Sequence, residues 1–249
     1  AKKSEVVAAL ADCEAAMDLC RQAVVSLEQF CNEWTERARK ITADAQAQMD
    51  RILPKLTRLV HLLGDLTKED LCDSNGTKPP QLVKRVIKAL CILMNVEPEP
   101  SGRESPNLED YWKVGHRLFR GPNLLDDLAC FDKDNIDPAT IRRLDDFISN
   151  DEIDVVNVKR LGGNLLEALF VFVHTMYQYH HVAMEVTPKK HLLFAIQGIT
   201  ETSTDVLRQR QKRLAMLMED CQELQNQVNA CKDEPVFAEE EEEELKKES

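Results

Sequence analysis

The chain has 249 residues, of which 43% are hydrophobic and only 5% aromatic, and it contains eight glycines. Because sheet-rich domains depend on aromatic residues, β-branched residues and glycine turns, this composition favours helices. The formal net charge is −12, so no basic excess supports nucleic acid as the main partner.

The acidic excess lies at the C-terminal end. Residues 233–249 hold nine acidic and two basic side chains, which is −7 of the total charge of −12. Such a run is typical of a solvated segment, and we expect 233–249 to be a disordered acidic tail. Residues 1–232 are then close to charge balance.

The cysteines and the apolar stretches exclude several kinds of site. None of the eight cysteines forms a C-x-x-C pair or a zinc-spaced cluster with histidine, so we expect small buried thiols in a reducing compartment. The longest apolar stretch, Leu165–Val173, is interrupted by Glu167 and is far shorter than the ~20 residues of a membrane span. We expect a soluble intracellular protein with no signal peptide, no cofactor and no membrane contact.

The first segment, Ser4 to about Leu71, carries an apolar stripe at every seventh residue. The stripe consists of Leu10, Met17, Val24, Cys31, Ala38, Ala45, Ile52, Leu59 and Leu66. A companion stripe (Cys13, Cys20, Leu27, Trp34 and Ile41) fails at Gln48 and Lys55, and its role passes to Met49, Leu56 and Leu63. Two such stripes predict a coiled-coil seam with competing registers. An ordinary amphipathic helix in a bundle is the alternative.

The end of the chain offers a partner for this helix. From Val186 a seven-residue stripe runs through Leu193, Thr200, Leu207, Leu214, Cys221 and Val228. Its companion contains Ile196, Ser203, Arg210, Leu217, Leu224 and Cys231, and a second set (Leu192, Ile199 and Val206) offers another register. We expect a second coiled-coil helix here, because neither stripe is stable without a partner.

Turn signals appear between the two arms, together with short amphipathic segments. We expect helices over Gln81–Met94, Leu108–Phe119, Leu124–Phe131, Pro138–Ile148 and Val155–Val186. The pattern predicts an all-α fold, in which an antiparallel coiled-coil hairpin is capped by a small multi-helix bundle. The expected parts are a first helix (1–73), a cap (74–187), a second helix (188–232) and the tail (233–249).

Several short motifs occur in one order. Leu53-Pro54, Leu63-Gly64-Asp65-Leu66 and Lys78-Pro79-Pro80-Gln81-Leu82-Val83 come first, then Trp112, then the segment Leu128–Ile136, and then Tyr179, Val182, Val186 and Pro188-Lys189-Lys190. This order over residues 53–197 resembles the stalk and microtubule-binding domain of dynein heavy chains. The family usually has Ala-Ser at Gly162-Gly163, tryptophan at Phe172 and glycine at Ala168. These departures indicate a divergent axonemal-type or non-motor member.

The resemblance implies a microtubule-binding stalk tip in which the coiled-coil register is coupled to affinity for the track. The partners would be the tubulin surface and the remainder of the motor heavy chain, in the cytoplasm and cytoskeleton, including the axoneme of cilia. The segment itself would not be an enzyme. Because the microtubule surface is acidic, the contact residues are expected among Lys84, Arg85, Lys88, Arg142, Arg143, Lys159 and Arg160. Pro54 and Pro188 are the expected hinges of the stalk helices.

The sequence is also compatible with other functions. Each basic residue could be an ordinary solvated surface charge. No phosphate loop, H-E-x-x-H motif or nucleophile elbow favours an enzyme, and His174 and His181 are two helical turns apart, unlike a cluster of metal ligands. A hairpin that grips RNA would need a basic rod. The main rival is a non-motor scaffold that kept the stalk-tip fold and lost strong microtubule binding.

Overall fold

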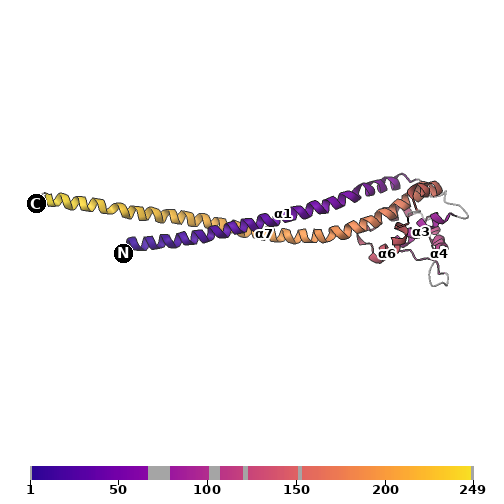
Figure 1. Ribbon diagram of the computed structural model, residues 1–249, viewed down its shortest axis with the longest axis horizontal. Coiled ribbons are helices and arrows are strands. Elements are labelled where there is room, and N and C mark those ends of the chain that lie inside the picture. The colour runs from indigo at the N-terminus through magenta and orange to yellow at the C-terminus, as the bar shows by residue number, and fades with distance from the viewer. Residues whose placement is uncertain (1, 67–78, 101–106, 120–122, 151–152, 248–249) are drawn as a thin grey trace. The chain divides into compact units, whose positions relative to one another are not determined.

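The computed structural model describes residues 2–66, 79–100, 107–119, 123–150 and 153–247. Its elements are α1 (Lys2–Gly64), α3 (Gln81–Leu93), α4 (Leu108–Phe119), α5 (Leu124–Ala129), a 3-10 helix η1 (Lys133–Asn135), α6 (Pro138–Ile148) and α7 (Val155–Lys247) (Figure 1). The expected all-α class is confirmed, and these described ranges contain no strand. The described cap helices begin at the expected residues.

The chain divides into two compact units. The arm unit is Ala1–Thr42 with His191–Ser249, and the cap unit is Ala43–Lys190. The cap unit therefore contains the end of α1 and the beginning of α7 in addition to the short helices. The expected boundary at residues 73 and 74 lies outside the described residues.

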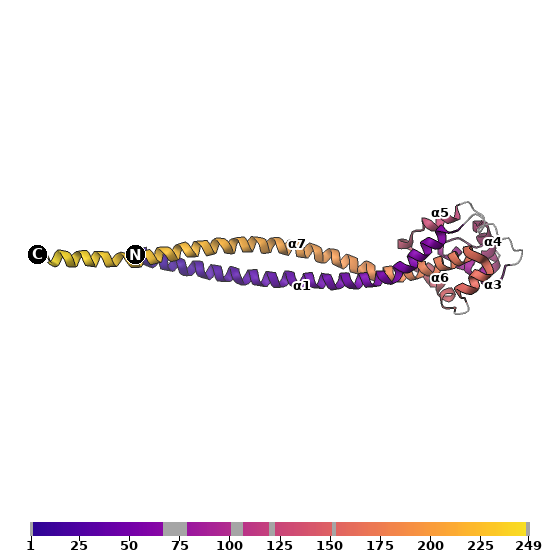
Figure 2. The same cartoon turned by 90° about the horizontal axis from the view of Figure 1, so that it is seen from above.

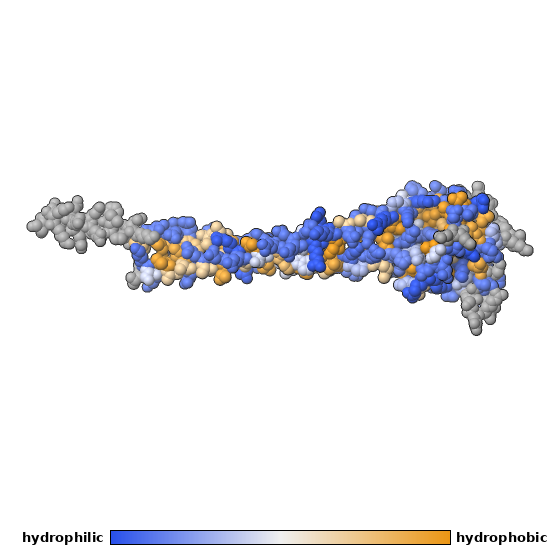
Figure 3. All heavy atoms as spheres, viewed as in Figure 1, coloured by the Kyte–Doolittle hydropathy of each residue, from blue (hydrophilic) through white to orange (hydrophobic). Residues whose placement is uncertain are grey.

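In the arm unit, α1 and α7 run side by side in opposite directions (Figure 2). The Cys13 thiol lies 3.6 Å from the carbonyl oxygen of Leu217, and the Cys20 thiol lies 3.5 Å from that of Arg210, so the α7 partner moves backward as α1 advances. Seam residues from both helices are buried, among them Cys20, Val24, Leu217, Cys221 and Val228. The view in Figure 3 shows a mainly hydrophilic outer surface with scattered apolar patches. This is the antiparallel pairing that the stripes predict.

One of the two possible apolar rows of α7 is used in this structure. Ile196 and Leu217 are buried, and Leu193, Leu207 and Leu214 are half-buried. The other set is more exposed: Leu192 is 46% exposed, and Ile199 and Val206 are each 40% exposed. The described arms have therefore adopted the first register and left the apolar row of the second uncovered.

The row change in α1 falls within the cap unit. Ala45, Ile52 and Leu59 continue the main stripe as buried residues, whereas Lys55 of the companion stripe is exposed. Met49, Leu56 and Leu63 are half-buried in its place. Polar contacts flank this seam: the Lys55 Nζ donates to Gln178 at 2.6 Å, and the Lys189 Nζ lies 2.6 Å from Asp44.

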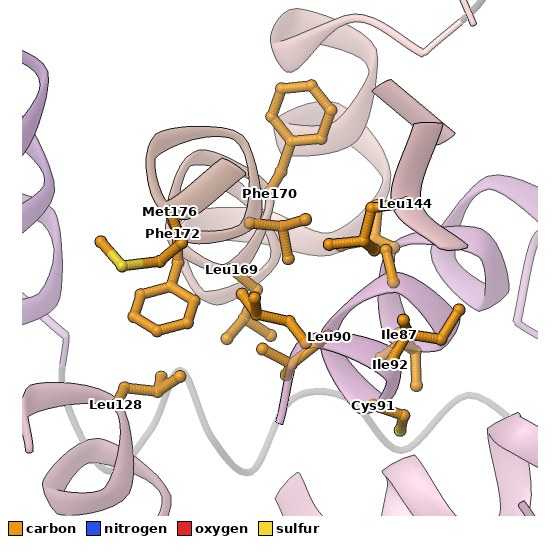
Figure 4. Close-up of a cluster of buried hydrophobic side chains, with 14 of the residues drawn as sticks. Ile87, Leu90, Cys91, Ile92, Leu128, Leu144, Leu169, Phe170, Phe172 and Met176 are labelled. Carbon is orange, nitrogen blue, oxygen red and sulfur yellow. The ribbon is translucent and has the colours of Figure 1, made fainter. Parts of the chain in front are cut away.

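The cap core forms where α3, α5 and α6 pack against α7. Figure 4 shows Leu90 of α3 and Leu169 of α7 among the clustered side chains, with Leu144 and Phe172 nearby. All four have at most 1% of their surface exposed. Because α3 contributes eight buried residues of its 13, it packs on nearly every side. The cap is therefore a rigid platform for any side chain that α3 and α6 present.

A sharp break divides α7 near its beginning. Gly163 has φ 67° and ψ −160°, and it is the residue at which the helical backbone is interrupted. Positive φ is costly for residues with a side chain, which explains why glycine stands here. At Gly162 a Cβ atom would lie 2.5 Å from Cδ2 of Leu166, so a larger residue at position 162 would clash with Leu166.

Two other expectations concern the acidic segment 233–249 and the two prolines. The helix α7 continues to Lys247, through the segment expected to be a disordered tail. Glutamate is a good helix former, and a helix that is already nucleated extends at little cost. Both α1 and α7 run through Pro54 and Pro188 without ending. Bending at the two prolines stays a prediction.

Among the described helices, none has an apolar stretch that would cross a membrane.

Replacing Gly163 by alanine tests the break. The free energy of unfolding should fall by about 1 kcal/mol, because alanine resists the left-handed backbone. Gly198→Ala is the matched control, since its Cβ would meet nothing within 4 Å. That variant should be stabilised by up to about 1 kcal/mol, as expected for glycine within a helix. Urea denaturation followed by circular dichroism measures both, and a stabilised Gly163→Ala variant would contradict the strain argument.

The buried His174 predicts acid sensitivity. The centre of its ring lies 4.2 Å from that of Phe170, and its Nε2 has no hydrogen-bond partner among the described residues. Burial lowers the pKa of His174 below 6.5, and the nearby charge of Lys55 lowers it to a smaller extent. The unfolded chain therefore binds a proton at His174 more readily than the folded chain does. The contribution of neutral His174 to the free energy of unfolding is complete above pH 6.5 and is lost as the pH falls toward the lowered pKa of the folded state. His174→Phe should flatten the loss of stability between pH 7 and 5. An unchanged slope would exclude His174 as its source.

Candidate functional site

The structure separates the three basic residues of α3. Lys84 is buried, with 8% of its surface exposed, whereas Arg85 and Lys88 are half-buried. The close packing of α3 on the core explains the difference, because only a narrow strip of this helix reaches solvent. Lys84 is therefore less accessible than a contact residue was expected to be. A direct contact through Lys84 stays a prediction.

Arg85 and Lys88 meet Arg143 of α6 around one cavity of about 320 Å³. The remaining lining is apolar, except for a carboxylate and an amide: Ala89, Ile92, Leu108, Asp146, Phe147, Asn150 and Ile153. The structure thus brings together basic residues from α3 and α6, which are far apart in the sequence. Arg142, beside Arg143, is exposed on α6 and does not line the cavity. Three cations and one carboxylate make the mouth of this cavity attractive to acidic groups.

Tyr111 of α4 organises the cations. Tyr111 is buried, with 3% of its surface exposed. Its hydroxyl accepts a hydrogen bond from Nη2 of Arg143 at 3.0 Å. Nζ of Lys88 lies 5.6 Å from the centre of its ring. A cation over a ring face and a hydrogen bond at the ring edge are both favourable. One buried side chain therefore orients basic groups from α3 and α6.

Lys159 has a partner within the chain. Its Nζ lies 2.7 Å from Oε2 of Glu167, and Nη2 of Arg58 lies 3.4 Å from the other oxygen. Glu167 is 6% exposed, and a buried carboxylate requires such pairing. In a straight helix, residues eight apart are separated by about 12 Å along the axis. The break at Gly163 lies between them and brings Lys159 back to Glu167. Arg160 is exposed.

Two segments of the motif series also meet. The Tyr179 hydroxyl donates to Asp134 at 2.5 Å, and Nζ of Lys133 lies 5.4 Å from the centre of the Tyr179 ring. This hydrogen bond, supported by Lys133, holds the pKa of Asp134 below its usual value. Burial, followed by the carboxylate, raises the pKa of Tyr179 to about 12. The contact fixes the loop around η1 against α7.

Sequence reasoning missed the residues that position these cations. Tyr111 and Glu167 are far in sequence from the residues they organise, and Arg58 is 109 residues from Glu167. The one available signal was a carboxylate inside the apolar stretch Leu165–Val173, which had to be paired if the stretch was buried. Within the described residues, no group of three or more histidine, cysteine or acidic side chains could hold a metal ion.

Comparison with known proteins identifies relatives of the chain. It is 30% identical to human dynein axonemal heavy chain 1 over 197 residues, and 31% identical to the rat protein of the same name over 215 residues. These matches cover 76% and 85% of this chain and 5% of each relative. Human dynein axonemal heavy chain 3 is 28% identical over 79% of the chain and 5% of its own length. The expected resemblance to dynein heavy chains is confirmed.

A solved structure, the microtubule-binding domain of dynein-c, is 29% identical and gives a TM-score of 0.49, with 58% of this chain and 95% of that chain covered. No family model matches the chain. The chain spans about a twentieth of the length of the curated relatives named above.

Lys159 and Arg160 allow the pairing of Glu167 to be tested. Lys159→Gln should lower the free energy of unfolding by about 1 to 2 kcal/mol, because Glu167 loses one of its two cations while it remains buried. Arg160→Gln removes the same charge at the next, exposed position and should change stability by less than about 0.5 kcal/mol. Equal effects in urea denaturation would contradict a structural role for Lys159.

Proposed function

Because the chain matches axonemal dynein heavy chains over three quarters or more of its length, we propose that it is the stalk tip of such a heavy chain and that its cap binds microtubules. The segment is not the catalytic part of the heavy chain. Hydrolysis of ATP would belong to a region outside this chain. The axoneme, where the relatives' names place them, is the proposed location.

The arrangement of Arg85, Lys88 and Arg143 carries the proposal. These cations come from two helices and surround one cavity, and a buried tyrosine orients Lys88 and Arg143, so they form a preorganised basic surface. A preorganised surface loses little entropy when it binds an acidic partner. The exposed Arg142 and Arg160 would extend the attraction at longer range.

We also propose that the register of α1 and α7 is coupled to microtubule affinity. A shift of about half a heptad needs a second seam of similar apolar content. The exposed row of Leu192, Ile199 and Val206 and the row change near Gln48 support this proposal, because each offers apolar residues outside the row now in use. Exchanging one row for the other would bury comparable apolar area, so the free-energy difference between the registers would be small.

A scaffold that has lost strong microtubule binding is the second candidate. The burial of Lys84 and the pairing of Lys159 with Glu167 favour it, because both reduce the number of cations that can face an acidic track. The two candidates differ in one measurable property, which is microtubule affinity at low ionic strength.

Co-sedimentation with microtubules over a salt series tests the proposed function. Binding should weaken as the salt concentration rises. The variant Lys88→Glu with Arg142→Glu should bind at least about tenfold more weakly, because the introduced carboxylates would face the acidic microtubule surface. Lys212→Glu with Arg213→Glu makes the same charge change at exposed positions of the arm unit and should bind as the unchanged chain does. A folded chain that does not bind at low salt would favour the scaffold.

A further inference from the structure

A pair of cysteines faces across the seam of the arm unit. Sγ of Cys221 in α7 lies 2.6 Å from Sγ of Cys13 in α1, although the two residues are 208 positions apart. Both belong to the apolar stripes, and both thiols are free. A disulfide bond is about 2.05 Å long, so the sulfur atoms need only a small further approach to form one.

We propose that Cys13 and Cys221 are a redox modification site, which a hydroperoxide oxidises to a disulfide that fixes α1 against α7 in one register. The consequence for microtubule affinity rests on the proposed function above. The site itself rests on the two sulfur atoms and on their place in the seam.

The two cysteines have different roles in the reaction. Cys13 is half-buried, whereas Cys221 is 8% exposed, so the peroxide reaches Cys13 first. The Cys13 thiolate attacks one oxygen of hydrogen peroxide; the S–O bond forms and the O–O bond breaks. The departing hydroxide takes up the proton that the thiol lost, so sulfenic acid and water result. The Cys221 sulfur then attacks the Cys13 sulfur, the S–S bond forms, and the S–O bond breaks with release of a second water. Two electrons pass from the two thiols to the peroxide.

The surroundings of the pair control its rate. The Cys221 thiol donates its hydrogen bond to Cys13, and Cys13 in turn donates to the carbonyl oxygen of Leu217. That bond to Cys13, followed by burial and the charges of Glu14 and Asp220, raises the pKa of Cys221 to about 11. Because the thiolate is the nucleophile, closure of the disulfide should accelerate as the pH rises toward that value. At neutral pH the closure of the disulfide should therefore be the slow step.

The cross-link suits one register only. A shift of half a heptad would move one helix along the other by about 5 Å. That displacement would carry the two sulfur atoms out of bonding distance. Oxidation would consequently select the register in which Leu192, Ile199 and Val206 remain exposed.

The full 249-residue chain, treated with graded hydrogen peroxide and then with a thiol-blocking reagent, tests the site. Non-reducing peptide mapping should recover a Cys13–Cys221 linked pair that dithiothreitol reverses. The linked pair should be lost in Cys13→Ser and in Cys221→Ser. Cys20→Ser is the matched control, because Cys20 lies in the same seam with its thiol on the carbonyl oxygen of Arg210, and the linked pair should persist there. Oxidation of Cys13 without a linked pair would overturn the proposal.

Two further readouts test what the bond does. Thermal unfolding followed by circular dichroism should occur at higher temperature in the oxidised chain, with no shift in Cys13→Ser; an unshifted transition in the cross-linked chain would overturn the proposed fixing of the helices. In co-sedimentation, the oxidised and reduced chains should differ severalfold in affinity. Equal, measurable affinities would instead overturn the register coupling, and absence of binding in both states would overturn microtubule binding. Neither result would alter the mapped disulfide, which supports the site by itself.

Discussion

The apolar stripe of α1 has to be covered, and this requirement governs the fold. A helix of 63 residues with an apolar residue at every seventh position is not stable in water alone. The residues that cover it lie near the other end of the chain, so the intervening segment must reverse the chain direction. In each unit the polypeptide meets this requirement by pairing α1 with α7. Each short helix of the cap likewise covers its apolar face by packing against its neighbours.

The periodicity of the apolar residues predicts these helices well, because the residues that repeat with the helical period are the ones that become buried. The stripe from Leu10 to Leu66 is buried or half-buried at every position, and α4 and α6 span the residues that their amphipathic patterns indicate. The choice between the two rows of α7 did not follow from the pattern, since both are apolar. It depends on which row meets α1, and a long-range pairing leaves no mark on either segment alone.

The candidate site was less predictable for the same reason. Basic residues can be read from the sequence, but whether they face solvent depends on the packing of the whole cap. Arg85 and Lys88 lie at a cavity with Arg143, whereas Lys84, one position from Arg85, is buried. Glu167 shows the limit most clearly, because its two cations come from α1 and from the far side of a helix break. Local pattern identifies the charge; tertiary structure decides its role.

The uncovered row of α7 has a consequence for the behaviour of many molecules together. Leu192, Ile199 and Val206 present apolar surface on a long, regular helix, which is a surface that a second copy of the chain could cover. Every copy also carries nine carboxylates within residues 233–249, and the net charge of −12 makes approaching copies repel. Colloidal stability of the isolated chain should therefore depend on ionic strength. Concentrated salt would screen the repulsion and leave the apolar attraction in place.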